Sequence, residues 1–324
     1  MIDGYGRKID YIRISVTDRC NLRCIYCMPE TGIQTVPGAE ILSCEEIRRL
    51  AEVFGELGIR RIRLTGGEPL TRRDLPELVK FLKDTAGIEQ VTLTTNGTGL
   101  KEQIRPLAQA GIDGINLSLD TRDRELYREI TGRDAFEKAW EGFLAALEYP
   151  EISLKINCVP LGLPGQNVWE LAELARDYPV HVRYIELMPL GMGKHFSAVP
   201  EKEIRSELTR RFGEGIPFRE RLGSGPARYY SFRGFRGKIG FISAVSHKFC
   251  SSCSRVRLTA RGFLKTCLQY ETGVDLKVLL QGGAGREIIR REVEEAIRRK
   301  PAEHQFGAKE VECGEKKMMS QIGG

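Results

Sequence analysis

Residues 11–27 read YIRISVTDRCNLRCIYC, in which a strand-like segment runs directly into three cysteines. The segment alternates polar and apolar side chains, a pattern that predicts a β-strand with one apolar face. Cys20, Cys24 and Cys27 follow at CxxxCxxC spacing, which seldom arises by chance with nine cysteines in 324 residues. Three thiolates suit a four-iron cluster whose fourth iron stays open for an outside ligand. A structural zinc ion is the alternative, but it needs a fourth protein ligand and none is close in the sequence.

Five more segments alternate in the same way, and helical patterns separate them. They are residues 61–65, 91–96, 115–120, 152–158 and, less cleanly, 180–186. The helical segment at 43–58 begins with Ser43 and Glu46, at the spacing of a capping box. Strand and helix repeated six times predict an α/β fold with parallel strands. A half-exposed antiparallel sheet also alternates, although tight turns rather than helices would then join its strands.

The alternation gives the predicted sheet one polar face. Parallel strands covered by helices on both sides are normally apolar on both faces. Here the second face is polar and cationic, and carries Arg13, Ser15, Arg61, Arg63, Thr92, Thr94, Asn116, Ser118, Lys155 and Asn157. A closed eight-stranded barrel would fill its interior with branched apolar side chains. We therefore expect an incomplete (β/α)6 barrel of the TIM type, open enough for a charged ligand.

The second part of the chain has a different character. Residues 201–212 predict a charged helix, and a Gly- and Arg-rich stretch after it indicates a domain boundary. We expect a partial barrel over 1–220 and a smaller C-terminal α+β domain over 221–324. Beyond the boundary, the patterns predict a hairpin around Arg236 and Gly237 and a helix over 286–300.

A second cysteine group lies in this C-terminal part. Cys250 and Cys253 are followed by Cys267, and His247 precedes Cys250 by three residues. Three cysteines and one histidine would make a four-ligand zinc site, so the sequence alone leaves zinc open here. The remaining cysteines stand apart from both groups, and we interpret them as bystanders: Cys44, Cys158 and Cys313.

The composition predicts a globular protein of the cytoplasm. Hydrophobic residues make up 41% of the chain and charged residues 29%, with no run of eighteen apolar residues that could span a bilayer. The first ten residues contain no apolar leader that would direct export. In a reducing compartment, clustered cysteines are metal or redox ligands rather than disulfides. The net charge of +6 suits an anionic ligand, while interleaved acids and bases argue against a nucleic-acid-binding arm.

The motifs resemble those of the radical S-adenosylmethionine (SAM) enzymes. CNLRCIYC after the first strand and TGGEP after the second carry this resemblance. A narrower resemblance, from about Arg13 to Gly324, is to the GTP 3′,8-cyclases that begin molybdenum cofactor biosynthesis. It rests on RISVTDRCNLRCIYCMP, RLTGGEPLTRRDL, TTNG, INLSLD, VSHKFCSSCSRVRLTARGFLKTCL and the terminal QIGG.

The resemblance implies two [4Fe–4S] clusters and SAM as cofactors. Cys20, Cys24 and Cys27 would hold the cluster that binds SAM and cleaves it to a 5′-deoxyadenosyl radical. A second cluster, with an open iron facing guanine, would be held by Cys250, Cys253 and Cys267. The positions that would contact SAM are Tyr26, Gly67, Ser118 and Met188. On the residues alone, an ordinary strand-to-helix turn is the favoured interpretation for Gly67, and core packing is the favoured one for Met188.

The resemblance also implies a GTP site. Its contacts would be Arg13, Arg63, Thr94, Lys155, Arg255 and Arg257, and three of these are cations that the alternation already turns inward. Arg255, Arg257, Gly323 and Gly324 would take part in catalysis, the two glycines as a flexible tail that threads into the site. The chain contains no GxxxxGK[ST] loop, so side chains must supply the charge that holds a triphosphate.

The implied activity is that of a lyase. It would convert GTP to (8S)-3′,8-cyclo-7,8-dihydroguanosine 5′-triphosphate, with 5′-deoxyadenosine and methionine as co-products. The radical would take the ribose 3′ hydrogen, and the carbon radical would attack C8 of guanine. The implied partners are an electron donor such as flavodoxin or ferredoxin, the cyclic pyranopterin monophosphate synthase that uses the product, and a second copy of the chain in a homodimer.

Two other classes of function stay open. One is another radical SAM enzyme with an auxiliary cluster, such as a peptide maturase, although such enzymes tend to carry more downstream cysteines. The other is a zinc protein that binds RNA through its basic residues. The brown colour of an iron–sulfur protein, with absorbance near about 400 nm, would distinguish the second class.

Overall fold

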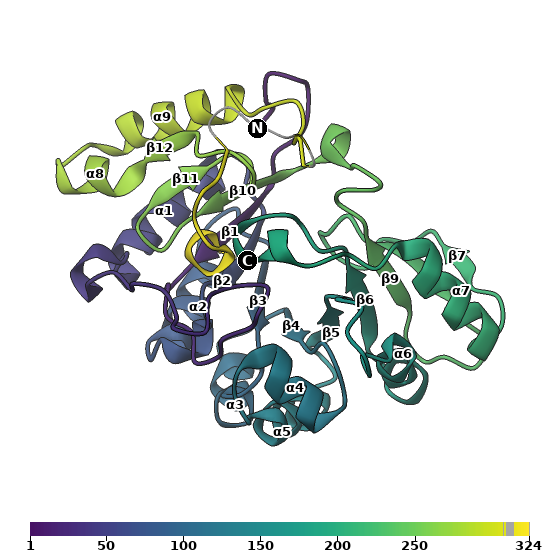
Figure 1. The fold of residues 1–324 in the computed structure, drawn as a ribbon. Coiled ribbons are helices and arrows are strands. Elements are labelled where there is room, and N and C mark those ends of the chain that lie inside the picture. Colours follow the sequence, from purple (N-terminus) through teal and green to yellow (C-terminus); the bar gives the residue numbers. More distant parts are fainter. Residues whose placement is uncertain (307, 309–313, 324) are drawn as a thin grey trace.

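One twelve-stranded sheet runs through the protein, of which the computed structural model describes residues 1–306, 308 and 314–323. The strand order is β12-β11-β10-β1-β2-β3-β4-β5-β6-β9-β8-β7. The strands curve into an arc, with helices along its outside (Figure 1). Among the described residues no pairing joins β12 to β7, so the sheet is open.

Six parallel strands in chain order form the middle of the sheet. Their bounds are β1 Tyr11–Ser15, β2 Arg61–Thr65, β3 Gln90–Thr95, β4 Gly114–Ser118, β5 Ser153–Cys158 and β6 His181–Ile185. The α/β class and the parallel order are therefore confirmed, and the antiparallel alternative is wrong. The finer description as a (β/α)6 barrel stays a prediction, because the sheet continues beyond these strands on both sides.

Amphipathic helices cover the apolar face of this sheet. They are α1 Cys44–Glu56, α2 Leu75–Asp84, α3 Leu100–Gln109, α4 Arg124–Thr131, α5 Phe136–Leu147 and α6 Val168–Asp177. Outward strand side chains such as Ile12, Ile62 and Val91 are fully buried against them. Helix α1 begins as predicted, because Ser43 Oγ accepts from the Glu46 amide and the Glu46 carboxylate accepts from the Ser43 amide. We call the opposite face of the sheet, inside the arc, the inner face.

C-terminal strands extend the sheet at both edges. At one edge β9 (Ile239–Ile242) pairs parallel with β6, followed by β8 (Arg228–Ser231) and β7 (Ile216–Phe218). At the other, β10 (Arg255–Leu258) pairs parallel with β1, followed by β11 (Phe263–Lys265) and β12 (Gly273–Asp275). The predicted hairpin is β8–β9. The predicted boundary after residue 220 falls between β7 and β8, which pair within this same sheet.

Four further helices lie among the described residues. They are α7 Glu201–Phe212, α8 Leu276–Gln281, α9 Arg286–Arg298 and the short α10 Met319–Ile322. Single 3-10 turns lie at Gly38–Glu40, Pro69–Thr71, Gly191–His195 and Cys250–Ser252. The described C-terminal residues lie inside the arc of strands, with Gly323 beside β1 and β2 (Figure 1). No described helix is both long enough and apolar enough to cross a membrane.

Candidate active site

The TGGEP turn packs directly on the loop that carries the first three cysteines. A Cβ atom at Gly67 would lie 2.2 Å from the carbonyl oxygen of Arg19. One at Gly66 would lie 2.5 Å from the carbonyl oxygen of Thr17. The Gly67 amide donates to Thr17 (2.8 Å) and the Glu68 amide to Arg19 (2.7 Å). The two glycines therefore hold the cysteine loop against the end of β2, since no side chain fits between them.

The first three thiols lie close enough to influence one another electrostatically. Burial raises the pKa of Cys20 to about 11, and burial with the neighbouring Cys20 raises that of Cys27 to about 12. Burial, Cys27 and Asp120 raise the pKa of Cys24 well above its usual value. A metal would supply the positive charge that ionises such thiols. Three mutually close, half-buried sulfur donors thus fit an iron–sulfur cluster.

Two buried carboxylates that the sequence did not single out flank this loop. Glu68 accepts hydrogen bonds from the Leu70 and Asn96 amides and from Thr95 Oγ1, and burial raises its pKa to about 7. Asp120 accepts from Tyr26 Oη (2.8 Å) and the Val159 amide, and burial raises its pKa to about 6.

The positions predicted to contact SAM come from four loops or strand ends around the first cysteines. Tyr26 is held by Asp120, Ser118 ends β4, and Met188 follows β6. Within the described part of the chain, the buried hydroxyls of Thr65 and Thr94 have no hydrogen-bond partner. Buried polar atoms normally have one, so these two hydroxyls fit a polar ligand on the inner face.

A row of arginines crosses the inner face. The strand register places Arg257 of β10 beside Arg13 of β1, and Arg13 beside Arg63 of β2. Adjacent strands lie about 4.8 Å apart, so the three side chains leave the same face as close neighbours. Arg255 is likewise in register with Tyr11, two residues earlier on both strands. The sequence predicted that Arg13 and Arg63 face inward and that Arg255 and Arg257 share one face, but not that β10 would align the two pairs.

These cations repel one another in a dry environment. Burial and then Arg255 lower the pKa of Arg257 to about 10, and burial and then Arg257 lower that of Arg13 well below its usual value. Arg61, by contrast, forms an ion pair with Asp10. A bound anion would reverse the repulsion around Arg13 and Arg257.

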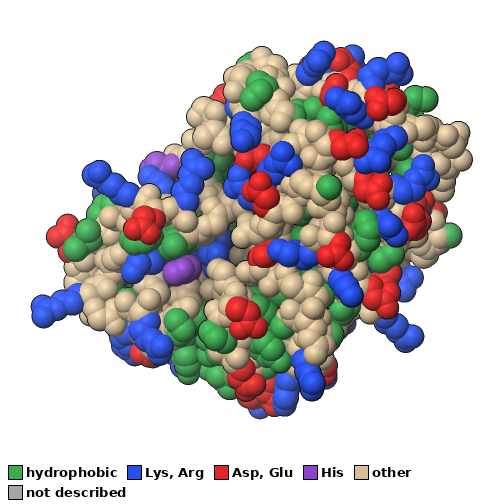
Figure 2. Space-filling model, turned by 180° about the vertical axis from the view of Figure 1, so that it is seen from behind, with side chains coloured by type: hydrophobic (Ala, Val, Ile, Leu, Met, Phe, Trp, Pro, Cys, Tyr) green, Lys and Arg blue, Asp and Glu red, His purple; other side chains and the backbone are tan. Residues whose placement is uncertain are grey.

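Arg183 of β6 is a buried cation that the sequence analysis did not select. It is 3% exposed, and it donates to the side-chain oxygens of Asn157 (2.9 Å) and Asn116. Nearby, burial and then Arg183 and Arg63 lower the pKa of Lys155 to about 8. The alternation of the strand 180–186 could have predicted that Arg183 faces inward. In the structure it is in register with Asn157, which lies on the inner face. On the face of the molecule opposite to that of Figure 1, Lys and Arg side chains lie at the bottom of a hollow (Figure 2).

Among the described residues, Arg63, Arg183, Arg255 and Arg257 form no ion pair with a carboxylate. Arg63 instead donates to Thr92 Oγ1 (3.2 Å), and Arg255 lies over the ring of Phe249 at 4.8 Å. The inner face thus concentrates positive charge without neutralising it, which suits a polyanionic ligand.

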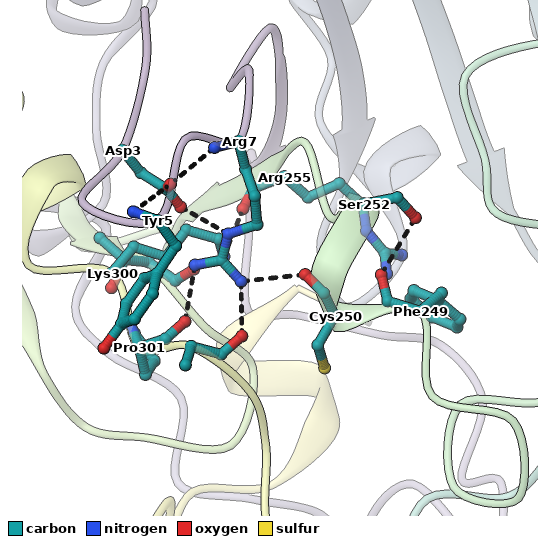
Figure 3. A network of polar contacts seen from close by, with 11 residues as sticks. Asp3, Tyr5, Arg7, Phe249, Cys250, Ser252, Arg255, Lys300 and Pro301 are labelled. Atoms are coloured by element: carbon teal, nitrogen blue, oxygen red, sulfur yellow. Dashed lines mark hydrogen bonds and ion pairs between the residues drawn. The ribbon is translucent and has the colours of Figure 1, made fainter.

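The second cysteine group lies against a network of buried cations (Figure 3). The Arg7 guanidinium donates to the carbonyl oxygens of Cys250 (2.9 Å), Pro301 (2.7 Å) and Ala302 (2.6 Å), and pairs with Asp3 at 2.6 Å. The first residues of the chain therefore fix the loop that carries Cys250. No local sequence pattern predicts this contact, because the partners lie far apart along the chain.

Lys300 also contacts the backbone around the second cysteine group. Its ammonium donates to the carbonyl oxygens of Arg255 (3.0 Å) and Thr266, the neighbour of Cys267. Burial opposes ionisation of Cys253, but Arg255 and Lys300 outweigh it and lower the pKa of that thiol to about 7.

The predicted zinc alternative finds little support in this geometry. His247 is exposed and lies 3.9 Å from Glu201, and its ring contacts Ser246 Oγ. No three His, Cys, Asp or Glu side chains of the described residues converge as ligands of one metal ion. The ligands of a single zinc ion lie about 2.0–2.3 Å from one point, whereas a cluster binds each cysteine through a different iron.

The C-terminal tail reaches the row of arginines. Gly323 has φ +77°, and its carbonyl oxygen accepts from Arg257. A Cβ atom there would lie 3.0 Å from Thr65 Oγ1 and 3.2 Å from the Cβ of Ser15. Gly323 thus lies on the inner face in a backbone conformation that favours glycine. Gly324 and Cys313 lie outside the described residues. Cys158 is fully buried on the apolar face, and Cys44 stands at the start of α1.

Two family models match the chain. The Radical SAM superfamily matches residues 14–178, and Molybdenum Cofactor Synthesis C matches residues 180–306. The fold, the cysteine loop and the first match define a radical SAM protein, a class that uses SAM together with an iron–sulfur cluster.

Curated relatives narrow the class over the full length. The protein named GTP 3′,8-cyclase from Pelotomaculum thermopropionicum is 43% identical over 329 residues, and its namesake from Desulforamulus reducens is 41% identical over 328. Each comparison covers 100% of both chains. The chain therefore belongs to the GTP 3′,8-cyclase family.

Solved structures with the same fold include a protein that was crystallised with a bound peptide. SuiB of Streptococcus suis bound to its precursor peptide SuiA has a TM-score of 0.61 and 15% identity. The similarity covers 91% of this chain and 67% of that one. The SAM-bound form of SuiB gives a TM-score of 0.60. At this identity the likeness concerns the fold alone.

Proposed function

We infer that this chain is a GTP 3′,8-cyclase that catalyses the first step of molybdenum cofactor biosynthesis. The observation that carries the inference is the set of inward cations, above all Arg63, Arg183 and Arg257, that have no carboxylate partner within the described chain. A buried cation without a counter-ion is costly, so these side chains call for an anionic ligand such as a triphosphate. The full-length similarity to named cyclases supports the same conclusion.

We propose that Cys20, Cys24 and Cys27 hold a [4Fe–4S] cluster beside bound SAM. When bound, the two supply the radical chemistry that the protein itself cannot perform. Around them, Tyr26, Gly67, Ser118 and Met188 contact SAM. The TGGEP turn packs against this loop and holds the three thiols in place beside the bound cofactor.

The second site in this proposal binds GTP. Cys250, Cys253 and Cys267 hold a second [4Fe–4S] cluster next to the guanine base. The nucleotide lies against Arg13, Arg63, Thr94, Lys155, Arg255 and Arg257, and we add Arg183 to this set. Each guanidinium that meets a phosphate oxygen contributes a charge-assisted hydrogen bond, so the nucleotide is held in one orientation. Arg255, Arg257, Gly323 and Gly324 act closest to the reacting part of the substrate.

The remaining expectations are part of the same proposal. The electron donor is a flavodoxin or a ferredoxin, and the product passes to cyclic pyranopterin monophosphate synthase in the cytoplasm. The active form is a homodimer, and residues 1–220 and 221–324 act as barrel and cluster domain.

Anaerobic incubation with GTP, SAM and a reductant tests the proposed function. We expect (8S)-3′,8-cyclo-7,8-dihydroguanosine 5′-triphosphate in amounts that match 5′-deoxyadenosine, and about eight iron and eight sulfide per reconstituted chain. The proposal fails if SAM is cleaved but GTP is recovered unchanged. About four iron plus one zinc per chain would make the second site structural instead.

A further inference from the structure

A buried ion pair outside the metal and substrate positions joins the C-terminal tail to the sheet. Lys265 ends β11 and pairs with Glu315, and their side chains are 3% and 1% exposed. The Lys265 ammonium also donates to the carbonyl oxygen of Tyr270. Neither residue has a place in the proposed chemistry. Burying two charges adds little net stability to the fold by itself. Stability alone therefore does not explain why this ion pair is buried.

The pair sits where the tail enters the inner face. In the antiparallel register of β10 and β11, Lys265 lies directly opposite Arg257, so both side chains leave the same face of the sheet. The tail meets the sheet at this point, since Gly314 bridges to Tyr270 and the Glu315 amide donates to Gln269 (2.6 Å). Lys265 is thus the cross-strand neighbour of Arg257, the arginine that binds the Gly323 carbonyl further along the tail.

After Glu315, hydrogen bonds within the tail fix its path toward the inner face. The other carboxylate oxygen of Glu315 accepts from the Lys317 amide (2.8 Å), and Gln321 Oε1 accepts from the Met318 amide (3.0 Å). Helix α10 then buries Ser320 and Ile322, which are 2% and 0% exposed.

The tail ends between the two proposed cofactor sites. Ser320 lies against Cys27, where its amide hydrogen bond lowers the pKa of that thiol against the larger effect of burial. Three residues later the Gly323 carbonyl meets Arg257. Glu315 fixes the path eight positions earlier, so a shift there would move both contacts.

We propose that Lys265 and Glu315 form a latch that positions Gly323, near the end of the tail, against Arg257 for the cyclisation of GTP. Both are positioning residues, since neither touches substrate or cofactor. The inference rests on the proposed function for its catalytic consequence, but not for the docking itself. Without Lys265, the carboxylate of Glu315 would be left buried and uncompensated, so the tail would leave the inner face.

Hydrogen exchange of the iron-loaded enzyme tests the docking. Glu315→Gln and Lys265→Met should each speed exchange of the amides at 315, 317 and 321 by about tenfold or more, because opening the tail exposes all three. Lys316→Met is the matched control, because Lys316 is an exposed charge next to the latch and should change nothing. Unchanged exchange in both latch variants would overturn the proposal.

Turnover tests the positioning role. In Glu315→Gln and Lys265→Met, cyclisation of GTP should fall by about tenfold or more while 5′-deoxyadenosine is still formed, which splits cyclisation from SAM cleavage. The double variant Lys265→Met with Glu315→Met should recover both tail protection and cyclisation, since an apolar pair can replace a buried ion pair. If the double variant protects its tail yet cyclises no GTP, the charges act in the chemistry and the latch is wrong.

The two proposals fail separately. A wild-type enzyme that made no cyclised product would contradict the proposed function. The difference in amide hydrogen exchange between Glu315→Gln and Lys316→Met would still test the latch.

Discussion

The two cysteine groups share one donor set but lie in opposite electrostatic surroundings. Around Cys24 the nearest ionisable groups are other thiols and the buried carboxylate of Asp120, and the thiol pKa rises well above its usual value. Around Cys253 they are Arg255 and Lys300, which outweigh burial and lower the thiol pKa to about 7. The first loop follows β1 and is fixed by the TGGEP turn, and the second is fixed by the cations Arg7 and Lys300.

This contrast indicates which partner supplies positive charge at each site. At the first group the metal must supply it, so assembly there releases protons that the thiols otherwise keep. At the second group the protein supplies part of it through Lys300 and Arg255. Reduction potentials of clusters depend on nearby charge and on hydrogen bonds, so we expect the second proposed cluster to be the easier of the two to reduce.

The largest expected effect separates the two groups by reaction. Cys24→Ser should reduce both 5′-deoxyadenosine formation and GTP cyclisation to background, because it removes a ligand of the proposed SAM-binding cluster. Cys253→Ser should abolish cyclisation and leave SAM cleavage measurable. Chromatography of both products from anaerobic assays gives the comparison.

Cys44→Ser serves as the control, since Cys44 stands at the start of α1 away from both groups, and it should turn over as wild type. The functional division between the groups collapses if Cys253→Ser stops SAM cleavage as completely as Cys24→Ser does.

The next effect concerns the cations behind the second group. Arg7→Met removes the donors to Cys250, Pro301 and Ala302 and leaves Asp3 buried without its partner. Breaking such a buried pair costs about 3–5 kcal/mol, so the loop should lose its shape locally. Iron analysis after reconstitution should then give about half of the wild-type content, while SAM cleavage persists.

Lys8→Met is the matched control for Arg7→Met, because Lys8 is an exposed cation one residue away. Full iron content in Arg7→Met would show that the amino-terminal segment is dispensable for the second site. Loss of SAM cleavage as well would show that Arg7 supports the whole fold rather than one site.

Local sequence patterns predicted some of this site and long-range pairing decided the rest. Spacing alone identified Cys20, Cys24 and Cys27, and two-residue periodicity correctly turned Arg13 and Arg63 inward, because both signals are local. The alignment of Arg257 with Arg13 depends on β10 pairing with β1, across more than two hundred residues. No local pattern encodes such a pairing.

Buried single residues were missed for a related reason. Arg7, Lys300 and Glu315 each stand in a segment with many charged neighbours. Nothing in the sequence distinguishes a charged side chain that will be buried from one that will be exposed. Arg183 differs from them, because the alternation of its strand could have predicted that it faces inward, where the structure pairs it with Asn157. The less regular alternation of 180–186 concealed it.

A smaller effect is expected from single cations of the inner face. Arg183→Met and Arg257→Met each remove one charge-assisted donor, and such bonds contribute about 1.5–3 kcal/mol. We therefore expect the dissociation constant for GTP to rise by about ten- to a hundredfold in each variant, measured by calorimetry under anaerobic conditions.

Arg286→Met on α9 is the control for charge, because Arg286 pairs with Glu52 and Glu56 away from the inner face. An unchanged GTP affinity in both Arg183→Met and Arg257→Met would mean that these cations stabilise the fold only. A change in SAM affinity of similar size would instead mean that these cations contact SAM as well as GTP.

The smallest expected effect tests the carboxylates of the first group through stability. Burial raises the pKa of Asp120 to about 6 from 3.8, so the folded chain binds this proton more tightly than the unfolded chain does. A raised pKa stabilises the fold at low pH, and that contribution is lost as the pH rises through about 6. Relative to Asp120→Asn, the iron-free wild type should therefore lose about 1 kcal/mol of unfolding free energy between pH 5 and 7.

Asparagine suits this comparison because its amide can still accept from the Val159 amide and donate to Tyr26 Oη. Denaturant unfolding at several pH values gives the difference, and Asp134→Asn, an exposed acid paired with Arg124, shows the background. A difference that stays flat across this range would mean that Asp120 is already ionised at pH 5. The first group would then carry a fixed negative charge beside its thiols, and its contrast with the cationic second group would be larger than the raised pKa implies.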